Sequence, residues 1–306
     1  IYKNKMNRKA FLKNSLFGTA GIGLALNNLS CDSLKRITIL HTNDVHSHIE
    51  PFSKDHSEFP NKGGFERRST IINKIRKENP NTLLLDAGDI FQGTPYFNFY
   101  GGEIEFKLMS MLKYDAITIG NHDFDNGIDG LEKQLPNAKF DIISSNYDFT
   151  NTVLDSKIND YKIYNKSGIK IGVFGLGIEL EGLVSKELYK ETKYLDPIEI
   201  ANDITKKLKE TENCDLVICL SHLGYKYEKF PNRICDVNLA EETKDIDLII
   251  GGHTHTFMNE PLITYNKVGK KVLINQAGCF GLYLGRIDFL FDSNNNKIFN
   301  SNLLMI

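Results

Sequence analysis

The sequence predicts a layered α/β fold in which two packed sheets are flanked by helices. From about residue 36 onward, short runs rich in Ile, Val and Leu alternate with helical patterns, which is typical of this fold class. Several strand-like runs also follow one another without an intervening helix, so a single doubly wound sheet is not expected. The chain has 306 residues and 41% hydrophobic content, so it can bury a large core.

Each expected strand is a short run of β-branched, leucine or aromatic residues, the types that favour extended backbone in a buried sheet. These runs are residues 37–40, 82–85, 116–119, 140–144, 161–164, 170–174, 216–220, 248–250, 272–275 and 284–291. A polar segment from Ser293 to Asn296, followed by Lys297, is typical of a hairpin tip. A short terminal strand is therefore expected after it.

Helices are expected where apolar residues recur on one face of a 3.6-residue period. In the first, Ile71, Ile72 and Ile75 share a face. The last begins at Pro197, which suits a first helical turn, and Asp196 is placed to cap it. The expected helices are residues 65 to about 77, about 104 to 112, and 197 to about 209.

The first 31 residues differ in composition from the rest. A basic segment around Arg8 and Lys9 precedes a stretch of small and apolar residues from 16 to 26, and Cys31 follows that stretch. This is the layout of a bacterial export signal. The basic segment is similar to the twin-arginine class, with Lys9 in place of the second arginine, and Cys31 is similar to the lipid-acceptor cysteine of bacterial lipoproteins.

An apolar run of about a dozen residues is too short to span the roughly 30 Å of bilayer hydrocarbon. We therefore expect residues 1–31 to be an export signal and residues 36–306 to form one catalytic domain. The expected location is the periplasm or cell envelope. Contact with the membrane is expected only through the signal or a lipid anchor.

Charge and cysteine content exclude two classes of function. The formal net charge is −2 and the sequence pI is about 6.5, so no basic surface for nucleic acid is expected. The 5 cysteines include no C-x-x-C pair, which argues against a zinc knuckle or a dense disulfide framework. Apart from Cys31, they are expected to be buried thiols.

Five of the predicted strands end within four residues of side chains that commonly bind metals. Open α/β sheets bind ligands at the carboxyl ends of their strands, where loops from distant parts of the chain converge. The sequence therefore predicts a metal site built from several loops. The residues at these strand ends are Asp44, His46, Asp89, Asn121, His122, His222, His253 and His255.

The spacing of these side chains suggests how they bind ions. Asp44 and His46 are two positions apart, so in an extended segment they would point to one side and hold one ion together. His253 and His255 repeat that spacing. Asp89 has two carboxylate oxygens and can bridge two ions. Mixed nitrogen and oxygen ligands without thiolates suit zinc, manganese, iron or a similar divalent ion.

The remaining histidines do not follow this pattern. Of the 8 histidines, His41, His48 and His56 lie away from the ends of apolar runs, and we interpret them as structural or surface residues. His48 stands only two residues beyond His46, so it could approach the site.

Six motifs follow one another over most of residues 36–306, and the first five contain these strand-end residues. They are Leu40-His41-Thr42-Asn43-Asp44-Val45-His46, Asp86-Ala87-Gly88-Asp89 with Phe91-Gln92-Gly93-Thr94-Pro95, Gly120-Asn121-His122-Asp123-Phe124-Asp125, Ser221-His222 with Gly224, Gly251-Gly252-His253-Thr254-His255, and Gly281-Leu282-Tyr283-Leu284-Gly285-Arg286. In these motifs and their order, the chain resembles the calcineurin-like metallophosphoesterases, and within them the 5′-nucleotidase branch.

The resemblance implies a fold, two cofactor ions and a reaction. The fold is a four-layer α/β/β/α sandwich of two mixed sheets flanked by helices. Two divalent ions would activate a bridging water, as a hydroxide, for attack on phosphorus. One ion would be held by Asp44, His46, Asp89 and His255, and the other by Asp89, Asn121, His222 and His253.

The resemblance also implies a role for two residues that are not ligands. His122 would face the phosphoryl group and either stabilise charge on its oxygens or protonate the leaving alkoxide. Asp125 would orient the imidazole and keep it positively charged. Positioned proton donors of this kind contribute about 10² to 10⁴ in rate.

The resemblance covers only a catalytic domain. Secreted 5′-nucleotidases usually have a C-terminal domain that places aromatic rings and arginines around the nucleoside, whereas this sequence stops at Ile306, where the metal domain would end. Three explanations remain open: a separately encoded subunit supplies that part, the sequence is a fragment, or the enzyme is a broad phosphoesterase.

The leading expectation is an exported 5′-nucleotidase-type phosphomonoesterase that acts on nucleotides or related small phosphate esters. Within the same chemistry, the alternatives are a 2′,3′-cyclic-nucleotide phosphodiesterase and a UDP-sugar hydrolase. An alternative from another class is the catalytic half of a hetero-oligomer that is inactive without a substrate-binding partner.

Overall fold

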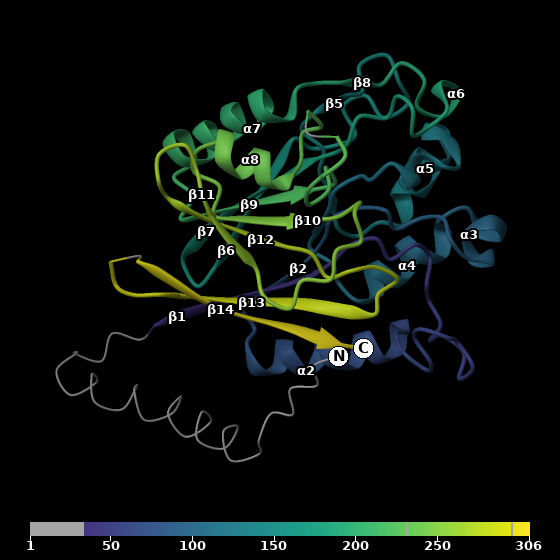
Figure 1. The fold of residues 1–306 in the computed structure, drawn as a ribbon, viewed down its shortest axis with the longest axis horizontal. Helices are drawn as coiled ribbons and strands as arrows, with labels where there is room; N and C mark the ends of the chain where they lie inside the picture. Colours follow the sequence, from purple (N-terminus) through teal and green to yellow (C-terminus); the bar gives the residue numbers. More distant parts are fainter. Residues whose placement is uncertain (1–33, 231, 295) are drawn as a thin grey trace, which may run out of the picture.

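In the computed structural model, which describes residues 34–230, 232–294 and 296–306, two six-stranded sheets pack face to face between layers of helices (Figure 1). The predicted four-layer α/β/β/α sandwich is therefore confirmed. The predicted export signal over residues 1–31, with Cys31, lies outside the described residues.

The first sheet is mixed. Its strands are β1 (Lys35–Thr42), β2 (Thr82–Asp86), β3 (Ala116–Ile117), β4 (Asp141–Ile142), β13 (Tyr283–Phe291) and β14 (Lys297–Met305). In space the order is β14-β13-β1-β2-β3-β4. β1 to β4 are parallel, whereas β13 runs antiparallel to both β1 and β14. The earliest described strand of the chain thus pairs with one of the last.

The second sheet is also mixed, with antiparallel strands at both edges. Its strands are β6 (Tyr161–Lys166), β7 (Ile169–Leu176), β9 (Leu216–Ser221), β10 (Leu248–Gly251), β11 (Leu262–Tyr265) and β12 (Lys271–Asn275), in the spatial order β11-β12-β10-β9-β7-β6. The four central strands are parallel. A separate two-stranded sheet joins β5 (Tyr147–Asp148) to β8 (Lys193–Tyr194).

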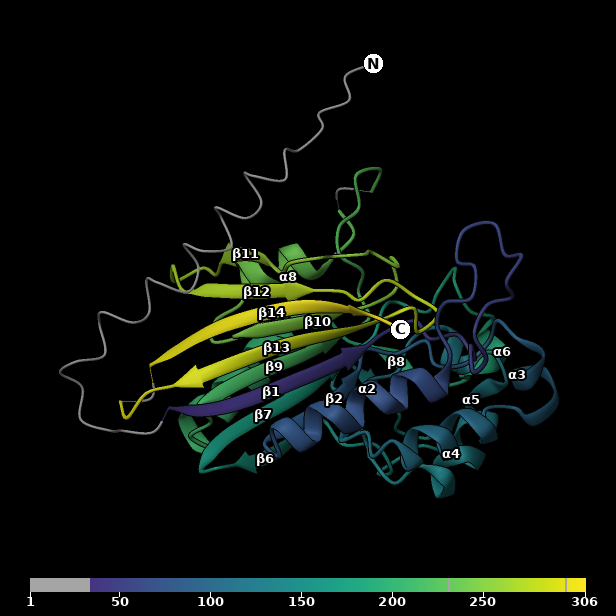
Figure 2. The same cartoon turned by 90° about the horizontal axis from the view of Figure 1, so that it is seen from below.

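Helices cover the outer face of each sheet (Figures 1 and 2). They are α2 (Phe65–Glu78), α3 (Pro95–Tyr100), α4 (Glu103–Met111), α5 (Gly127–Gln134), α6 (Lys186–Tyr189), α7 (Pro197–Lys206) and α8 (Asp236–Glu242). Short 3₁₀ turns occupy η1 (His122–Phe124) and η2 (Leu135–Asn137), and one π-helical turn, η3 (Lys207–Thr211), extends α7. No helix in the described part of the chain is both long and apolar enough to cross a membrane.

Three hydrophobic cores hold the layers together. Alternate residues of one strand enter different cores, because successive side chains point to opposite faces. In β1, Ile39 packs between the sheets, while Leu40 packs toward α2, α4 and α5. Leu83 and Leu84 of β2 divide in the same way. The third core joins the second sheet to α7 and α8. A strand that is buried on both faces therefore appears in the sequence as a continuous run of apolar residues.

The fold places the predicted ligands at one end of both sheets. β1 in Figure 2 and β9 and β10 in Figure 1 end on the same side of the molecule. The loops that follow these strands therefore meet beyond the carboxyl edge, as expected for an α/β protein.

Several elements differ from the sequence prediction. Only residues 116–117 of the predicted strand 116–119 form a strand, and only 141–142 of 140–144, with Ile143 adding an isolated bridge to Asn159. The terminal strand was expected to be short, yet all nine residues of β14 pair with β13. α3, α5, α6 and α8 were not predicted, and neither were β5, β8 and β11. These helices have at most eight residues, and too few turns to show a clear 3.6-residue period.

Candidate metal centre

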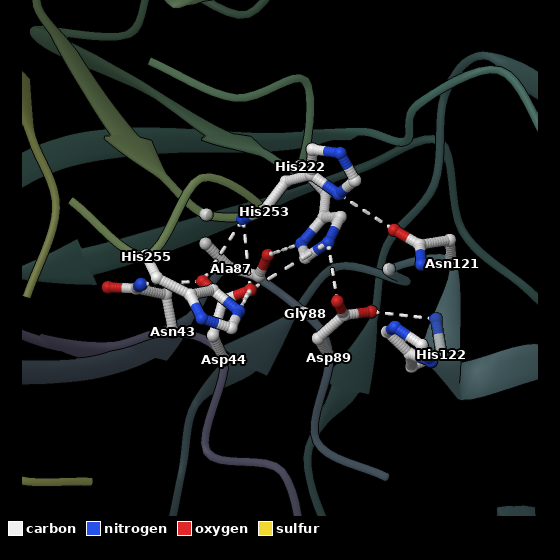
Figure 3. Close-up of polar contacts among 12 residues, drawn as sticks. Asn43, Asp44, Ala87, Gly88, Asp89, Asn121, His122, His222, His253 and His255 are labelled. Carbon is white, nitrogen blue, oxygen red and sulfur yellow. Dashed lines mark hydrogen bonds and ion pairs between the residues drawn. The ribbon is translucent and has the colours of Figure 1, made fainter. Parts of the chain in front are cut away.

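All eight predicted strand-end residues lie on five loops at the carboxyl edge of the sheets. Asp44 and His46 follow β1, Asp89 follows β2, Asn121 and His122 follow β3, His222 follows β9, and His253 and His255 follow β10. Figure 3 shows Asp44 and His255 on one side, Asn121 and His122 on the other, and Asp89 and His222 between them. Residues from both sheets thus face one small volume.

One group of ligand atoms consists of Asp44, His46 and His255, which lie within 4.8 Å of one another. His255 Nε2 is 3.3 Å from Asp44 Oδ1 and 3.1 Å from His46 Nε2. The backbone carbonyl of Phe91 lies 3.2 Å from His46 Nδ1, which orients that ring. Two imidazole nitrogens and a carboxylate oxygen therefore converge on one point.

A second group consists of Asp89, His222 and His253, again within 4.8 Å. Asp89 Oδ2 is 3.0 Å from His222 Nε2. The side chain of Asn121 adds a neutral oxygen, because its Oδ1 lies 2.8 Å from His253 Nδ1 (Figure 3). The structure thus brings all four residues of the second predicted ligand set together.

Asp89 stands between the two groups. Its Oδ2 faces His222 of the second group at 3.0 Å and His46 of the first at 3.8 Å. Its Oδ1 accepts a hydrogen bond from the backbone N–H of His122 at 2.8 Å. One carboxylate can therefore contribute to both groups, as the resemblance implied.

The arrangement around His222 fits a cation. The ring is fully buried, and its Nδ1 donates to the carbonyl of Ala87 at 2.7 Å. Nε2 is thus left to bind either a proton or a metal ion; it lies against Asp89 and forms no hydrogen bond within the described residues. His222 Nε2 is buried and faces the Asp89 carboxylate, and in the first group two imidazole nitrogens face each other. Donors of this kind, placed so close together, suit divalent ions.

Electrostatics lead to the same conclusion. Burial alone would lower the pKa of His222, but the adjacent Asp89 carboxylate outweighs it and raises the pKa to about 10, so a proton occupies Nε2 unless a metal ion takes its place. In turn, although burial opposes ionisation, His222 and His46 hold the pKa of Asp89 well below its usual range. Burial lowers the pKa of His253 to about 4, so this ring is neutral and can act as a ligand at neutral pH. Asp89 thus attracts positive charge to the centre.

The backbone of the ligand loops was predicted incorrectly. Asp44 and His46 were placed in an extended segment, whereas both have left-handed φ angles, of 51° and 49°. Asp89, His253 and His255 share this conformation, with φ of 55°, 69° and 52°. Left-handed backbone is uncommon for residues other than glycine and costs roughly 1 kcal/mol or more. Tight turns, rather than extended segments, therefore aim these side chains.

The same-side spacing argument fails for His253 and His255. The structure places His253 with Asp89 and His222, and His255 with Asp44 and His46. The turn between the two histidines directs their rings to different groups. This division agrees with the ligand sets that the resemblance implied.

Glycine permits the close approach of the loops. A side chain at Gly120 would place its Cβ 2.2 Å from Asp89 Oδ1 and 2.8 Å from the His222 ring. These distances are far shorter than any normal contact, so only glycine fits at this position.

His122 and Asp125 lie at the rim of the centre. His122 Nδ1 is 2.8 Å from Asp125 Oδ2, and the His122 side chain is 39% exposed. This hydrogen bond raises the pKa of His122 above its ordinary value. With Nδ1 engaged by the carboxylate, Nε2 is the atom available to a substrate.

One important residue of the site was not singled out in the sequence. The buried carboxylate of Asp123 accepts hydrogen bonds from four backbone N–H groups, those of Gly120, Asp89, Ile90 and Phe91, at 2.8 to 3.1 Å. It therefore ties the Asp89 loop to the Asn121 loop. Its position between His122 and Asp125 was the available signal.

The three histidines excluded from the prediction lie outside both ligand groups. His41 is buried in β1, where its Nε2 is 3.0 Å from the Asn275 amide, and burial lowers its pKa to about 4. His56 packs against Phe59 in the loop after β1. His48 packs at a tilt against Phe280 next to the centre, with ring centroids 4.4 Å apart.

Comparison with known proteins connects this geometry to a family. Residues 37–257 match the family model described as calcineurin-like phosphoesterase. This segment begins in β1 and ends just beyond His255, so it contains every candidate ligand.

The curated relatives are 5′-nucleotidases. The chain is 35% identical to snake venom 5′-nucleotidase from Crotalus adamanteus over 286 residues, which are 87% of this chain and 47% of that protein. It is 36% identical to the human 5′-nucleotidase over 290 residues, 86% of this chain and 48% of that protein. The chain thus spans about half the length of the curated relatives it matches.

A solved structure with the same fold is similar over a comparable range. The 5′-nucleotidase precursor from Thermus thermophilus superposes with a TM-score of 0.80 at 31% identity, covering 89% of this chain and 55% of that one. The similarity therefore extends over both sheets and over the loops that carry the candidate ligands.

Proposed function

Because the chain belongs to the calcineurin-like phosphoesterase family, we propose that it is a 5′-nucleotidase-type phosphomonoesterase that removes phosphate from nucleotides. Membership of the family makes it a hydrolase of phosphoric ester bonds. The names of its curated relatives and of its structural relative support a nucleotide as substrate.

The two ligand groups would each hold one divalent ion. Asp44, His46, Asp89 and His255 would bind the first, and the second would be bound by Asp89 together with Asn121, His222 and His253. Two such ions supply activation of a water at neutral pH and a clamp for the phosphoryl oxygens. Zinc, manganese and iron all fit these nitrogen and oxygen donors.

His122 would act on the phosphoryl group from the rim. The Asp125 carboxylate binds Nδ1 and favours the protonated form of the ring. The N–H at Nε2 of this imidazolium is then available to a substrate. That proton can be donated to the leaving alkoxide, or to a phosphoryl oxygen that gains charge in the transition state. Asp125 thus acts through His122 as a positioning residue.

The observation that carries the proposal is the position of Asp89. Its carboxylate joins two ligand groups, and it accepts a hydrogen bond from the backbone of His122. The metal ligands and the proton donor are therefore fixed relative to one another by one side chain. Such fixed placement is what phosphoryl transfer needs from a protein.

A substrate panel tests the proposal. The isolated chain, supplied in turn with Zn²⁺, Mn²⁺ and Fe²⁺, should release phosphate from 5′-AMP faster than it hydrolyses 2′,3′-cyclic AMP, UDP-glucose or ribose 5-phosphate. A chelator should abolish the activity, and added metal should restore it. Faster hydrolysis of 2′,3′-cyclic AMP would replace the proposal with a cyclic-nucleotide phosphodiesterase, and faster hydrolysis of UDP-glucose would replace it with a UDP-sugar hydrolase. Inactivity toward all four, with two ions bound, would indicate a catalytic half that needs a partner subunit.

We also propose that the chain is exported. The charge and apolar pattern of residues 1–31 supports export, as does a structural relative described as a precursor. The finer proposal is a periplasmic or cell-envelope location with lipid attached to Cys31. Fractionation of producing cells, with mass spectrometry of the amino-terminal peptide, tests both parts.

A further inference from the structure

An aromatic cluster next to the metal centre has no role in the mechanism above. We propose that Phe280, His48 and Phe52, together with the cleft beside them, form a subsite for the planar heteroaromatic base of the leaving nucleoside. This inference rests on the proposed function and deepens it. It assigns base recognition to the catalytic domain itself.

The cluster begins at the metal ligands. The Phe280 ring lies 6.0 Å from the His46 ring and 5.8 Å from the His255 ring, between centroids. On its other side it packs against His48 at 4.4 Å. His48 in turn stacks on Phe52 at 5.0 Å. The rings therefore form a continuous surface that leads away from the first ligand group.

Phe280 is held in an unusual backbone conformation. Its φ is 58°, in the left-handed region that bulky residues rarely adopt. The backbone N–H of Phe280 donates to the carbonyl of the candidate ligand Asp44 at 2.7 Å, which fixes the ring beside the centre. Strained residues concentrate at ligand clamps and active sites. Here the strain places an aromatic ring directly beside the first ligand group.

A cleft of about 570 Å³ continues from the cluster. His48 and Phe52 line one wall, while Tyr96, Phe99 and Tyr100 of α3 line the other. This volume is within the usual range of small-molecule sites. The cleft is also fixed relative to the metal centre, because Thr94, which caps α3, donates a hydrogen bond to the carbonyl of Ser47, next to His46.

The chemistry of the walls selects an uncharged planar group. No lysine or arginine is among the described residues that line the cleft, and its one carboxylate, Glu50, accepts a hydrogen bond from Tyr96 at 2.7 Å. A second phosphate would find no cation there. Aromatic walls instead favour a flat ring, and stacking one base on aromatic side chains changes affinity by about 5- to 150-fold.

Substrate selectivity tests this subsite. With metal supplied, the wild-type chain should prefer 5′-AMP over ribose 5-phosphate by about 5-fold or more in kcat/KM. Phe280→Leu should raise the KM for 5′-AMP about tenfold, with kcat within about twofold, and leave the KM for ribose 5-phosphate unchanged. Phe280→Tyr should restore the preference, because it keeps the ring.

A matched control is available far from the metal centre. Tyr265→Leu removes an exposed ring from β11, next to the first residue of β12 and so at the opposite end from the metal centre, and should alter neither KM. If Phe280→Leu does not fold, Phe52→Leu provides the same test at the far end of the cluster. Equal loss for both substrates, or no change for either, would overturn the subsite.

A binding measurement separates failure of the subsite from failure of the proposed function. Adenosine binding to the metal-free chain can be followed by calorimetry, whether or not the chain hydrolyses nucleotides. The subsite predicts that Phe280→Leu weakens adenosine binding about tenfold, while Tyr265→Leu does not. Binding that is unaffected by Phe280→Leu, or absent in the wild-type chain at millimolar adenosine, would contradict the inference.

Discussion

His122 and Asp125 touch the metal centre without belonging to either ligand group. The backbone N–H of His122 donates to Asp89, and the ring packs edge-on against the His46 ring, with centroids 5.3 Å apart, without hydrogen bonding to a ligand. The side chain can therefore be changed while every ligand atom stays in place. This separation allows ion binding and turnover to be measured independently.

Replacing His122 with asparagine should abolish most turnover but not metal binding. Loss of a positioned proton donor is expected to lower kcat by about 10² to 10⁴. Metal analysis of the purified variant should still find two ions for each chain. The His222→Asn variant provides the contrast, because it removes a candidate ligand and should lose an ion. Loss of both ions from the His122→Asn variant would show that His122 is needed to build the centre.

Asp123 should contribute to stability rather than to chemistry. Asp123→Ala leaves four buried N–H groups without their acceptor, and each such group costs about 1–3 kcal/mol. We expect the free energy of unfolding to fall by at least about 2 kcal/mol, measured in urea with a chelator present. Asp125→Ala, at a half-exposed carboxylate, should cost less than about 1 kcal/mol. Equal effects would contradict this role.

For the individual residues of the metal centre, the sequence predicted which side chains take part but not their backbone angles. The strand-end pattern identified the side chains that the structure gathers into two groups. The left-handed φ of His253 and His255 depends on contacts between loops that are far apart in sequence, so their division between the groups could not follow from spacing alone. The role of Asp123 depends on the same contacts.

Among the helices and strands, α7 begins where two neighbouring residues in the sequence predict a helix start. Asp196 accepts hydrogen bonds from the backbone N–H groups of Ile198 and Glu199, at 2.8 and 3.0 Å, and Pro197 occupies the first turn. Two of the unpaired N–H groups at the helix start are thereby satisfied. Both sequence signals predicted this start correctly.

Removing this cap should destabilise the chain by a modest and measurable amount. Asp196→Ala is expected to lower the free energy of unfolding by about 1 kcal/mol, within the usual range of roughly 0.5 to 2 kcal/mol, as measured in urea. Asp203→Ala, at an exposed position within α7, is the matched control and should change stability by less than about 0.5 kcal/mol. An unchanged midpoint for Asp196→Ala would show that the cap contributes nothing.

The elements that could be predicted are those with their own strong pattern. β2, β9 and β10 are buried throughout, between two layers, and consist mainly of apolar residues, so their composition alone indicates them. β3 and β4 each have two paired residues, too few for any period to appear. Their extent is set by neighbouring strands rather than by their own sequence.

On the scale of the whole molecule, each ligand group joins the two sheets. Asp44 and His46 follow a strand of the first sheet, whereas their companion His255 follows a strand of the second. In the other group, Asp89 comes from the first sheet and His222 from the second. An ion in either group would therefore connect the layers, in addition to the hydrophobic core between them.

Removal of metal should consequently lower the stability of the entire domain. Each ion that binds the folded chain at 100 times its dissociation constant adds about 2.7 kcal/mol, which corresponds to roughly 5 °C in Tm. Calorimetry with and without a chelator measures the shift, and added metal should reverse it. An unchanged Tm, with metal analysis showing that the ions have left, would mean that the sheets do not depend on them.

The pairing of β1 with β13 also sets the timing of folding. Lys35, in the earliest described strand, pairs with Phe291, far along the sequence, so β1 lacks this partner until residues 283–291 have been synthesised. Contacts between such distant segments slow folding. Until β13 emerges from the ribosome, one side of β1 is an open edge that can pair with another chain. Slow synthesis or truncation before residue 283 should therefore promote aggregation.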